Sequence, residues 1–557
     1  MIEYAILHYP ESKYCFALDN KTVELRIRIA RVDNPDIYVI YGGKYDYSLK
    51  RKSIKMERCY TDRLYAYYKV KIKLYDPRLV YIFKIVEGNN NLYYSEDGLT
   101  KKYNFKLNFY NSFQYAYVNS CDVMEEIPWL KNASFYQNFI DRFNIGNRNK
   151  DMSYINTRWG DKPTPHSFTG GDIKGITEKL NYIKKLGINA IYLTPIFKSI
   201  SNHKYDISDY YNIDSMFGDK EDLHELITKA HSLGIRIVLD AVFNHASENL
   251  KEFQDVLKNK EKSKYYNWFI IKNDEPLDYE CFAACKYMPK LNTSNKEVQN
   301  YLINIGSYWI KEFDIDGWRL DVSDEVSHEF WRLFRLKIKE CKSDAVLIGE
   351  NWHDASQYLN GDQYDSIMNY AFTKASLDFF AFNKFNASDM ANKLNSILMR
   401  NNTNANNMML NLLDSHDTLR FYTELKCNGD RLDAALALLF MFPGVPCIYY
   451  GTENRMEGGY DPDSRRCMDW NLEFKNNPTK LLIRRLTSLK RKIKDSDVRI
   501  YSSDGLLIVD RLAKNNLYRL VINNSSHNIK YISNSPYAAN LYADSYIRPD
   551  GFLIDKI

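Results

Sequence analysis

Residues 317–326, Gly-Trp-Arg-Leu-Asp-Val-Ser-Asp-Glu-Val, place an arginine and a carboxylate two positions apart. Residues two apart in a strand point to the same face, so Arg319 and Asp321 are expected to lie side by side. A guanidinium beside a carboxylate lowers its pKa and keeps it ionised, and a rigidly held carboxylate can act as a nucleophile. A single pair of this kind is more often a structural salt bridge. The interpretation therefore depends on which other residues converge on it.

Further polar residues stand at the ends of other predicted buried strands. Asp240 ends one such strand and is followed by His245, Glu350 ends another, and His416 and Asp417 follow a third. In a barrel of parallel strands, the catalytic groups lie at the carboxyl ends of the strands. Because buried unpaired carboxylates are costly, a cluster of acids at these ends needs a metal ion or a reaction to account for it.

The elements that must position these residues alternate between buried strands and amphipathic helices over residues 121–481. Helical spacing of apolar residues is seen in 173–186 and 223–233. Repeated units of this kind predict a (β/α)8 TIM barrel, and residues 246–295 are expected to form an excursion after its third strand. The strands predicted are 188–193, 235–240, 315–321, 346–350, 409–414 and 445–450.

The two ends of the chain have the pattern of β-domains. In residues 1–120 apolar residues alternate with charged ones over 23–29 and 68–74, and turn signals separate the runs. This pattern predicts an N-terminal β-sandwich. Residues 482–557 are β-like again and predict a small C-terminal β-sandwich domain. The central barrel would then occupy residues 121–481.

Composition indicates an ordinary soluble protein with a near-balanced charge. The chain has 557 residues, of which 45% are hydrophobic and 26% charged, and its formal net charge is +5. This argues against a nucleic-acid partner. The N-terminus lacks the pattern of a secretory signal, and the longest apolar run, 434–442, is too short to span a membrane. The nine cysteines are scattered and odd in number, which favours the reducing cytoplasm.

Several segments together resemble the α-amylase family of glycoside hydrolases. Asp240-Ala-Val-Phe-Asn-His245, Gly317-Trp-Arg-Leu-Asp321, Gly349-Glu350-Asn-Trp and Asp414-Ser-His-Asp417 stand in the order of that family's motifs. Tyr205-Asp206 is similar to a further family segment at the substrate subsite. The resemblance covers the whole predicted barrel, and chance agreement of all these segments is negligible.

Two more segments resemble one subgroup, which contains neopullulanase, cyclomaltodextrinase and maltogenic amylase. These are Met288-Pro-Lys-Leu-Asn292 and Glu325-Val326. The subgroup also carries an N-terminal β-sandwich of this length, related to starch-binding modules. Asp324 departs from the subgroup, which typically has asparagine there. Because this position would line the acceptor side, the added charge bears on linkage preference and on transglycosylation.

The resemblance implies roles for individual residues. Asp321 would be the nucleophile, Glu350 the general acid and base, and Asp417 the third catalytic acid, which binds the distorted sugar. Two such carboxyls imply a retaining double displacement through a covalent glycosyl-enzyme. The implied substrate-binding residues are Tyr205, His245, Arg319, Asp324, Glu325, Val326, His416 and Arg466.

The resemblance also implies a candidate site for a structural Ca²⁺ ion, and no organic cofactor. In the subgroup this ion lies between the segment before the first barrel helix and an Asn/Asp-rich loop after the first strand. The matching residues are Asn147 and Asp151 in the loop, with Gly170 and Asp172 in the segment. Few acids are placed here to supply the oxygen ligands that calcium prefers.

The implied activity is hydrolysis of α-1,4 glucosidic bonds, with α-1,6 bonds as a further candidate, in cyclomaltodextrins, pullulan, starch or maltooligosaccharides. A homodimer is implied too, because in the subgroup the N-terminal domain caps the partner's active site. Two alternatives stay open. One is a glucosyltransferase or isomerase of the trehalose-forming type on the same barrel, and the other is a non-catalytic glucan-binding or scaffold protein.

Overall fold

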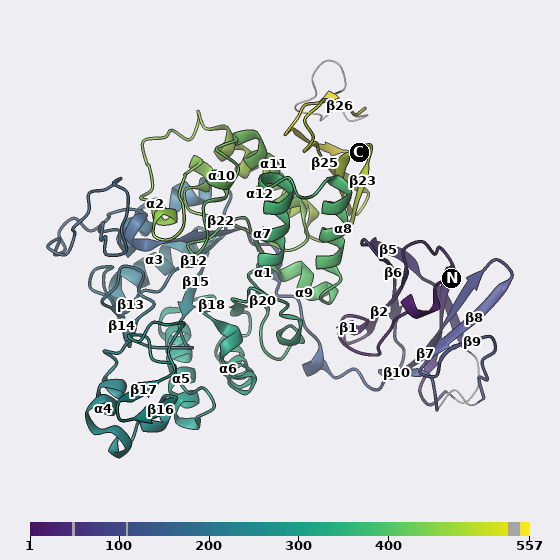
Figure 1. Cartoon of the computed structure of the whole chain (residues 1–557), viewed down its shortest axis with the longest axis horizontal. Coiled ribbons are helices and arrows are strands. Elements are labelled where there is room, and N and C mark those ends of the chain that lie inside the picture. Colours follow the sequence, from purple (N-terminus) through teal and green to yellow (C-terminus); the bar gives the residue numbers. More distant parts are fainter. Residues whose placement is uncertain (47–50, 107–109, 533–545) are drawn as a thin grey trace.

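The computed structural model describes residues 1–46, 51–106, 110–532 and 546–557. An N-terminal β-domain, a central barrel and a C-terminal β-domain follow one another along the chain (Figure 1). The N-terminal strands form a lobe at one end of the molecule, at the lower right of Figure 1, and the C-terminal strands lie above them. The predicted fold class is confirmed.

Eight parallel strands form the barrel, and they neighbour one another in chain order except at the point of closure. β11 pairs with both β12 and β22, and a parallel bridge between Met368 and Leu410 joins the ends of β20 and β21. The strands are buried along their length because helices cover their outer faces. In chain order they are β11 (Phe135–Asn138), β12 (Ala190–Leu193), β15 (Arg236–Ala241), β18 (Gly317–Leu320), β19 (Val346–Gly349), β20 (Ser366–Ile367), β21 (Leu410–Leu412) and β22 (Val445–Tyr449).

Local signals start the barrel helices. The Asp172 side chain accepts a hydrogen bond from the Gly175 amide and so caps α2 (Ile173–Lys185). Asp219 and Asp222 form a capping box at the start of α3 (Lys220–Ser232). The other long helices of the barrel are α5 (Lys296–Phe313), α6 (His328–Cys341), α8 (Ala387–Leu398), α11 (Gly429–Met441) and α12 (Pro478–Ile493).

The excursion after the third strand lies between β15 and α5, within the range predicted for it. It contains α4 (Lys251–Asn259) and a hairpin of β16 (Ile271–Asp274) and β17 (Leu277–Tyr279). An isolated bridge between His245 and Lys290 joins its two ends, and another between Phe269 and Leu291 ties its middle to its second end. The excursion is therefore held at the mouth of the barrel, beside the end of β15.

The N-terminal domain is a sandwich of two antiparallel sheets around its own apolar core. One sheet contains β1 (Cys15–Asp19), β2 (Thr22–Ala30), β6 (Tyr65–Lys73) and β5 (Glu57–Thr61). The other contains β4 (Lys52–Lys55), β3 (Asp36–Gly43), β7 (Leu79–Glu87), β8 (Asn90–Ser95) and β9 (Gly98–Thr100), and β10 (Phe113–Tyr115) pairs with β7.

Polar side chains of β2 dock on the barrel. Glu24 and Arg26 are 0% and 1% exposed and form an ion pair of 2.7 Å. The Arg26 guanidinium donates to the Asn401 carbonyl at 2.9 Å and to the Thr403 hydroxyl at 2.7 Å. This buried pair fastens the N-terminal domain to the segment that begins α9 (Thr403–Met408).

The C-terminal domain begins after α12. That helix crosses the predicted boundary at residue 482, and its Ile483 and Leu486 belong to the barrel core. The domain contains a sheet in the order β23 (Asp497–Ser503), β24 (Leu506–Ala513), β25 (Asn516–Ile522) and β28 (Phe552–Lys556). A pair of short strands, β26 (Ile529–Lys530) and β27 (Tyr546–Ile547), completes its described part. Within the described residues, none of the helices has the length and hydropathy needed to cross a membrane.

Candidate active site

One guanidinium gathers the acids at the carboxyl ends of the strands. Arg319 lies on β18 and is 1% exposed. Its Nη1 lies 2.6 Å from Asp321 Oδ1 and 3.1 Å from Asp240 Oδ1. Its Nη2 lies 2.7 Å from Glu350 Oε2 and 4.0 Å from Asp417 Oδ2. The three predicted catalytic acids and Asp240 are therefore brought together around a single positive charge, each from a different strand end.

Burial decides how these acids titrate. Removal from water raises the pKa of Asp321 well above its usual range, and the neighbouring Glu350 carboxyl raises it further. The Arg319 guanidinium opposes both effects but does not overcome them. The sequence had predicted a lowered pKa for Asp321 from this arginine alone. Burial also raises the pKa of Glu350 and brings that of Asp240 to about 6. The cluster therefore retains protons at a higher pH than isolated carboxyls do.

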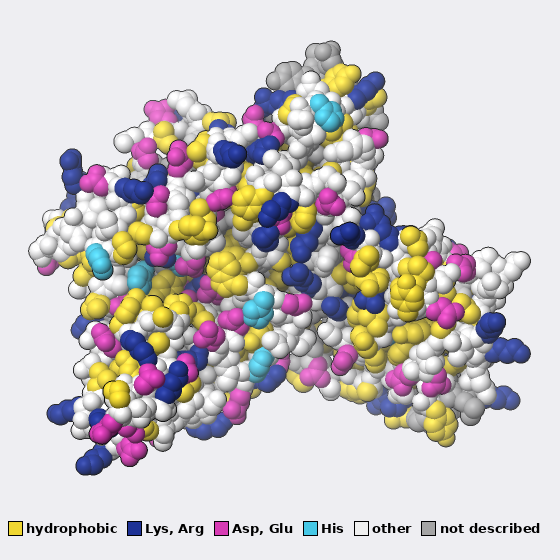
Figure 2. All heavy atoms as spheres, viewed as in Figure 1, with side chains coloured by type: hydrophobic (Ala, Val, Ile, Leu, Met, Phe, Trp, Pro, Cys, Tyr) yellow, Lys and Arg dark blue, Asp and Glu magenta, His cyan; other side chains and the backbone are white. Residues whose placement is uncertain are grey.

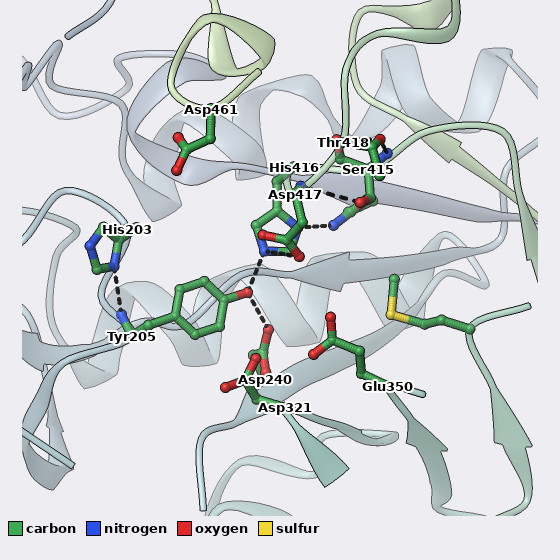
Figure 3. A network of polar contacts seen from close by, with 12 residues as sticks. His203, Tyr205, Asp240, Asp321, Glu350, Ser415, His416, Asp417, Thr418 and Asp461 are labelled. Carbon is green, nitrogen blue, oxygen red and sulfur yellow. Dashed lines mark hydrogen bonds and ion pairs between the residues drawn. The ribbon is translucent and has the colours of Figure 1, made fainter. Parts of the chain in front are cut away.

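Tyr205 and His416 form the floor beside these acids (Figure 3). Their rings are stacked with an interplanar angle of 4° and a centroid distance of 5.5 Å. The Gln137 amide contacts His416 Nδ1 at 2.7 Å, so the neutral ring carries its proton on Nε2. That nitrogen lies 2.5 Å from the Tyr205 hydroxyl, which in turn donates to Asp240 at 3.0 Å. Both His416 nitrogens are thus engaged by protein, and burial holds its pKa well below the usual range.

Asp417 is held from two sides at the edge of the cluster. His416 Nε2 lies 3.2 Å from its Oδ2, and Arg465 Nη2 lies 3.4 Å from its Oδ1. Arg465 also binds Asp461 at 3.0 Å, and both residues come from the loop that follows β22. Burial raises the pKa of Asp417, and the two arginines oppose this.

Asp321, Glu350 and Asp417 open into a cleft of about 490 Å³, whereas Asp240 lies behind its lining residues. Clefts of about 560 and 720 Å³ lie at the junctions of the barrel with its neighbouring domains, and the described residues that line them include none of these four acids. The cleft is lined by His203, Tyr205, His245, Phe282, Cys285, Tyr287, Met288, Asp321, Val322, Asp324, Glu325, Glu350, Trp352, Asp417, Asp461 and Arg465.

The excursion and the loop after β19 supply aromatic walls. The Phe282 ring stacks on His245 at 4.8 Å, and His245 Nε2 is buried with no hydrogen-bond partner among the described residues. Trp352 stacks on Tyr370 at 3.7 Å between centroids, is 55% exposed, and donates to Glu350 Oε1 at 3.2 Å. Flat apolar surfaces beside an unused N–H are well suited to sugar rings with their hydroxyl groups.

A strained residue connects the nucleophile candidate to the acid candidate. Val322 adopts φ 43° and ψ 44°, a left-handed conformation that is rare for a β-branched residue. This bend turns the chain out of β18 into η6 (Ser323–Glu325) and directs the Val322 amide to Glu350 Oε2 at 3.1 Å. The strain is thus coupled to the orientation of Glu350.

The segment after Val322 carries the predicted acceptor-side residues. The Asp324 carboxylate pairs with His353 at 2.8 Å, and Glu325 pairs with Lys290 at 2.9 Å. His353 had not been selected from the sequence, although it follows the Glu350 motif closely. Val326 is 3% exposed and packs in the barrel core rather than lining the cleft.

Arg466 does not lie where the sequence analysis placed it. Its guanidinium binds Asp463 at 2.9 Å and it does not line the cleft formed by the described residues. The adjacent Arg465 points into the cleft instead. His203, Phe282, Cys285 and Tyr287 were also missed. Contiguity along the chain gives no signal for them, because they meet the acids only through folding.

The four residues predicted for calcium are not all brought together. Asp172 and Gly170 lie close to each other, but the ammonium of Lys150 lies between their oxygens. The Asn147 and Asp151 side chains accept hydrogen bonds from the nearby Asn149 and Ser153 amides. Among the described residues, no group of three or more His, Cys, Asp or Glu could hold a metal ion. This donor set does not fit calcium.

Fold and site together define a class of protein. An eight-stranded parallel barrel with acids at the carboxyl ends of several strands, opening into a cleft with aromatic walls, is the architecture of a TIM-barrel enzyme. Asp321 and Glu350 both contact one guanidinium, and glycoside hydrolases use a pair of carboxyl groups of this kind. The site therefore indicates a glycoside hydrolase.

Comparison with known proteins identifies the family. Residues 137–481 match the model of the alpha amylase catalytic domain, and residues 1–119 match that of the alpha amylase N-terminal ig-like domain. The chain belongs to the α-amylase family of glycoside hydrolases.

Similar proteins come from one subgroup of that family. A cyclomaltodextrinase of Thermoanaerobacter pseudethanolicus is 43% identical over 94% of this chain and 93% of its own length. An intracellular maltogenic amylase of Bacillus subtilis is 40% identical over 88% of this chain and 85% of its own. The solved structure of a cyclomaltodextrinase superposes with a TM-score of 0.91 at 35% identity and covers 100% of both chains. The resemblance seen in the sequence, including the subgroup, is confirmed.

Proposed function

We propose that this chain hydrolyses α-1,4 glucosidic bonds, and as a further candidate α-1,6 bonds, in cyclomaltodextrins, pullulan, starch or maltooligosaccharides. The observation that carries the proposal is the placement of Asp321 and Glu350 on the two terminal nitrogens of Arg319, at 2.6 and 2.7 Å. Because one guanidinium holds both carboxyls close together, both can act on the same glycosidic bond. The names of the similar proteins, cyclomaltodextrinase and maltogenic amylase, support this substrate class.

In the first step, Glu350 donates its proton to the glycosidic oxygen while an Asp321 oxygen attacks the anomeric carbon. The bond to the leaving sugar breaks, that sugar carries away the proton, and a glycosyl ester forms on Asp321. In the second step, Glu350 removes a proton from water, the water oxygen attacks the anomeric carbon, and Asp321 departs as a carboxylate. Two inversions give overall retention.

The charge balance of the cleft matches these steps. Arg319 and Arg465 bring two positive charges, whereas the acids paired with them, Asp240, Asp321, Glu350, Asp417 and Asp461, would bring five negative ones if all were ionised. In a buried site such an excess of like charge favours retention of a proton. The general acid needs a proton at this stage, and the raised pKa of Glu350 supplies it. Arg319 contacts Asp321 and Glu350 at nearly equal distances, 2.6 and 2.7 Å, so the retained proton belongs to the pair, and the proposed first step uses the form in which Glu350 carries it.

The remaining predicted residues serve binding of the reacting sugar. Asp417, fixed by Arg465 and His416, would accept hydrogen bonds from its hydroxyls and favour the oxocarbenium-like transition state. His245 Nε2 has no hydrogen-bond partner in the described part of the chain and can bond to the same ring. Tyr205 presents its ring to the cleft, and contacts of its hydroxyl with Asp240 and His416 fix the orientation of this ring.

The acceptor side carries two paired carboxylates. Asp324 pairs with His353 and Glu325 with Lys290, and both carboxylates line the cleft. Charged groups at this side would orient either water or a second sugar for the second step. We therefore propose that these two ion pairs set the ratio of hydrolysis to transglycosylation.

We also propose a cytoplasmic homodimer. All nine cysteines fall within the described residues and are unpaired, which suits a reducing compartment. Figure 2 shows hydrophobic side chains gathered on the visible face of the N-terminal lobe, and that domain exposes Tyr4, Val32 and Leu64 by 90%, 80% and 63%. Apolar surface of this kind favours contact with another chain. Basic and acidic side chains are interspersed on the same view, consistent with no nucleic-acid partner.

The deciding experiment compares kcat/KM on β-cyclodextrin, pullulan and soluble starch, with products identified and the anomer followed by NMR. We expect release of α-anomers first and loss of activity in Asp321→Asn. Exclusive isomerisation of maltose would favour the trehalose-forming alternative. Failure to release reducing ends from any α-glucan, with no effect of Asp321→Asn, would favour a binding protein. Scattering at micromolar concentration tests the dimer.

A further inference from the structure

The Lys150 side chain lies buried at the junction of two loops. Its Nζ lies 2.8 Å from the Gly170 carbonyl, 2.8 Å from the Met216 carbonyl and 3.0 Å from Asp172 Oδ2. The side chain is only 7% exposed. An ammonium has three N–H donors and no acceptor, so three oxygens around it satisfy it completely. Lysine is almost never this buried unless it is paired.

The three oxygens belong to two segments of the chain, because Gly170 and Asp172 are near neighbours and Met216 lies much further along. Lys150 follows η3 (Ile140–Arg142), which comes directly after β11. Gly170 precedes α2 and has φ +92°, a conformation that favours glycine. Met216 lies between β14 (Ile207–Ile213) and α3. One ammonium therefore joins the loops that follow the first two barrel strands.

The carboxylate at this junction is also fully engaged. Asp172 Oδ1 accepts from the Gly175 amide at 2.7 Å and from the Gly146 amide at 2.9 Å. Its Oδ2 accepts from the Asn147 amide at 3.0 Å, in addition to the Lys150 ammonium. The loop thus wraps around Asp172 through its backbone and places Lys150 against the same carboxylate.

This arrangement competes with a divalent ion for the same oxygens. Calcium takes six to eight oxygen ligands, drawn from carboxylates, carbonyls and water. Here one carboxylate and two carbonyls already lie within hydrogen-bond distance of an ammonium. The Asn147 and Asp151 side chains, which the sequence had predicted as further ligands, bond instead to the Asn149 and Ser153 amides. A Ca²⁺ ion at this place would also meet the positive charge of Lys150.

We infer that the Lys150 ammonium takes the place of a structural divalent cation at this junction, so that the fold needs no calcium here. The positive charge is supplied by the chain itself and cannot be removed by a chelator. The inference concerns stability and does not depend on the proposed substrate.

The junction also reaches the wall of the cleft. Lys204 Nζ lies 2.9 Å from Asp214 and 3.4 Å from Met216 Sδ, and Tyr205 is the next residue. Met216 therefore contacts both Lys150 and the residue that precedes Tyr205. Loss of the Lys150 ammonium should loosen this wall and raise KM more than it lowers kcat.

The first test measures the unaltered protein. We expect its Tm to be the same after dialysis against EDTA and after addition of CaCl₂, and its calcium content after purification without chelator to be well below one equivalent. A Tm that falls with EDTA, or calcium bound near one per chain, would overturn the inference.

The second test uses matched variants. Lys150→Met should lower Tm by several degrees, because the buried Asp172 loses its partner. Lys174→Met is the control, since Lys174 pairs with Asp222 at 3.2 Å but is 42% exposed, and we expect little change. Lys150→Arg should retain most of the stability. Equal Tm values for Lys150→Met and Lys174→Met would contradict the inference. If Lys150→Met does not fold, the measurements on the unaltered protein and on Lys150→Arg still decide.

Discussion

Replacement of Glu350 by glutamine removes its proton transfer while keeping the size of the side chain. The amide keeps the length of the side chain, and its oxygen can still accept from the Val322 amide or from Trp352 Nε1, now 3.1 and 3.2 Å from the carboxylate. It cannot protonate a leaving group, and it loses the ion pair with Arg319. Removal of a positioned general acid costs about 10²–10⁴ in rate, which corresponds to about 3–5 kcal/mol in the activation free energy.

The size of the loss should depend on the leaving group. We expect Glu350→Gln to lose about 10²–10⁴ in kcat/KM on β-cyclodextrin, whose leaving oxygen needs a proton. On α-maltosyl fluoride the first step should be much less affected, because fluoride departs with little help from an acid. The second step stays slow, since Glu350 also acts as its base. Stopped-flow detection of fluoride should therefore show a burst, and intact mass should show a maltosyl-enzyme.

The pH profile gives an independent check. Burial raises the pKa of Glu350, so the alkaline limb of kcat/KM lies above the range of an ordinary glutamate, and activity falls as the pH rises through this value. The Glu350→Gln variant should lack this limb. Asp321→Asn is the control, because it cannot form the covalent intermediate. Equal losses on both substrates without a burst would refute the assigned role of Glu350.

Two further predictions concern the domain junction and the acceptor side. Arg26→Met leaves Glu24 buried without its charge partner and should lower the free energy of unfolding by about 3–5 kcal/mol. The double variant Glu24→Gln with Arg26→Met should recover most of this loss, measured by denaturant unfolding. An equal loss in the single and the double variant would contradict the role of the buried pair. Asp324→Asn should increase the share of transglycosylation products, because it removes a carboxylate that orients water beside the acceptor. The backbone carbonyl of Asp354 and the Asp324 carboxylate raise the pKa of His353, so this product ratio should change with pH through His353 titration in the unaltered protein. A pH-independent ratio there, measured by chromatography, would argue against the pairing.

The barrel was predictable where its strands are long and apolar. Six strands were found because each has an uninterrupted buried run. The first strand, which was expected before the loop that holds Asn147, was given no range because Gln137 and Asn138, both fully buried, give β11 a polar sequence. The sixth was missed because β20 has only two residues, Ser366 and Ile367, too few to show a period. Short or polar segments become strands because they pair with neighbouring strands of the barrel, and their own sequence pattern does not show this.

The site was predictable where its residues lie in contiguous motifs. Asp321 and Glu350 each end a strand and could be read directly. Arg465 was not distinguished from Arg466, because which of two adjacent arginines faces the cleft depends on the turn that carries them. Lys150 was overlooked for a similar reason. The residues around it suggested a cation, but only the folded loop shows that the cation belongs to the chain.

The excursion between β15 and α5 has a consequence for how specificity can change. It contributes Phe282, Cys285, Tyr287 and Met288 to the cleft, while the acids come from the strands of the barrel. Its ends are joined by the bridge between His245 and Lys290, so the insertion begins and ends at nearly the same place. Evolution or engineering can therefore replace this whole insertion with another one. Such a replacement would change which glucan fits the cleft without moving the groups that break the bond.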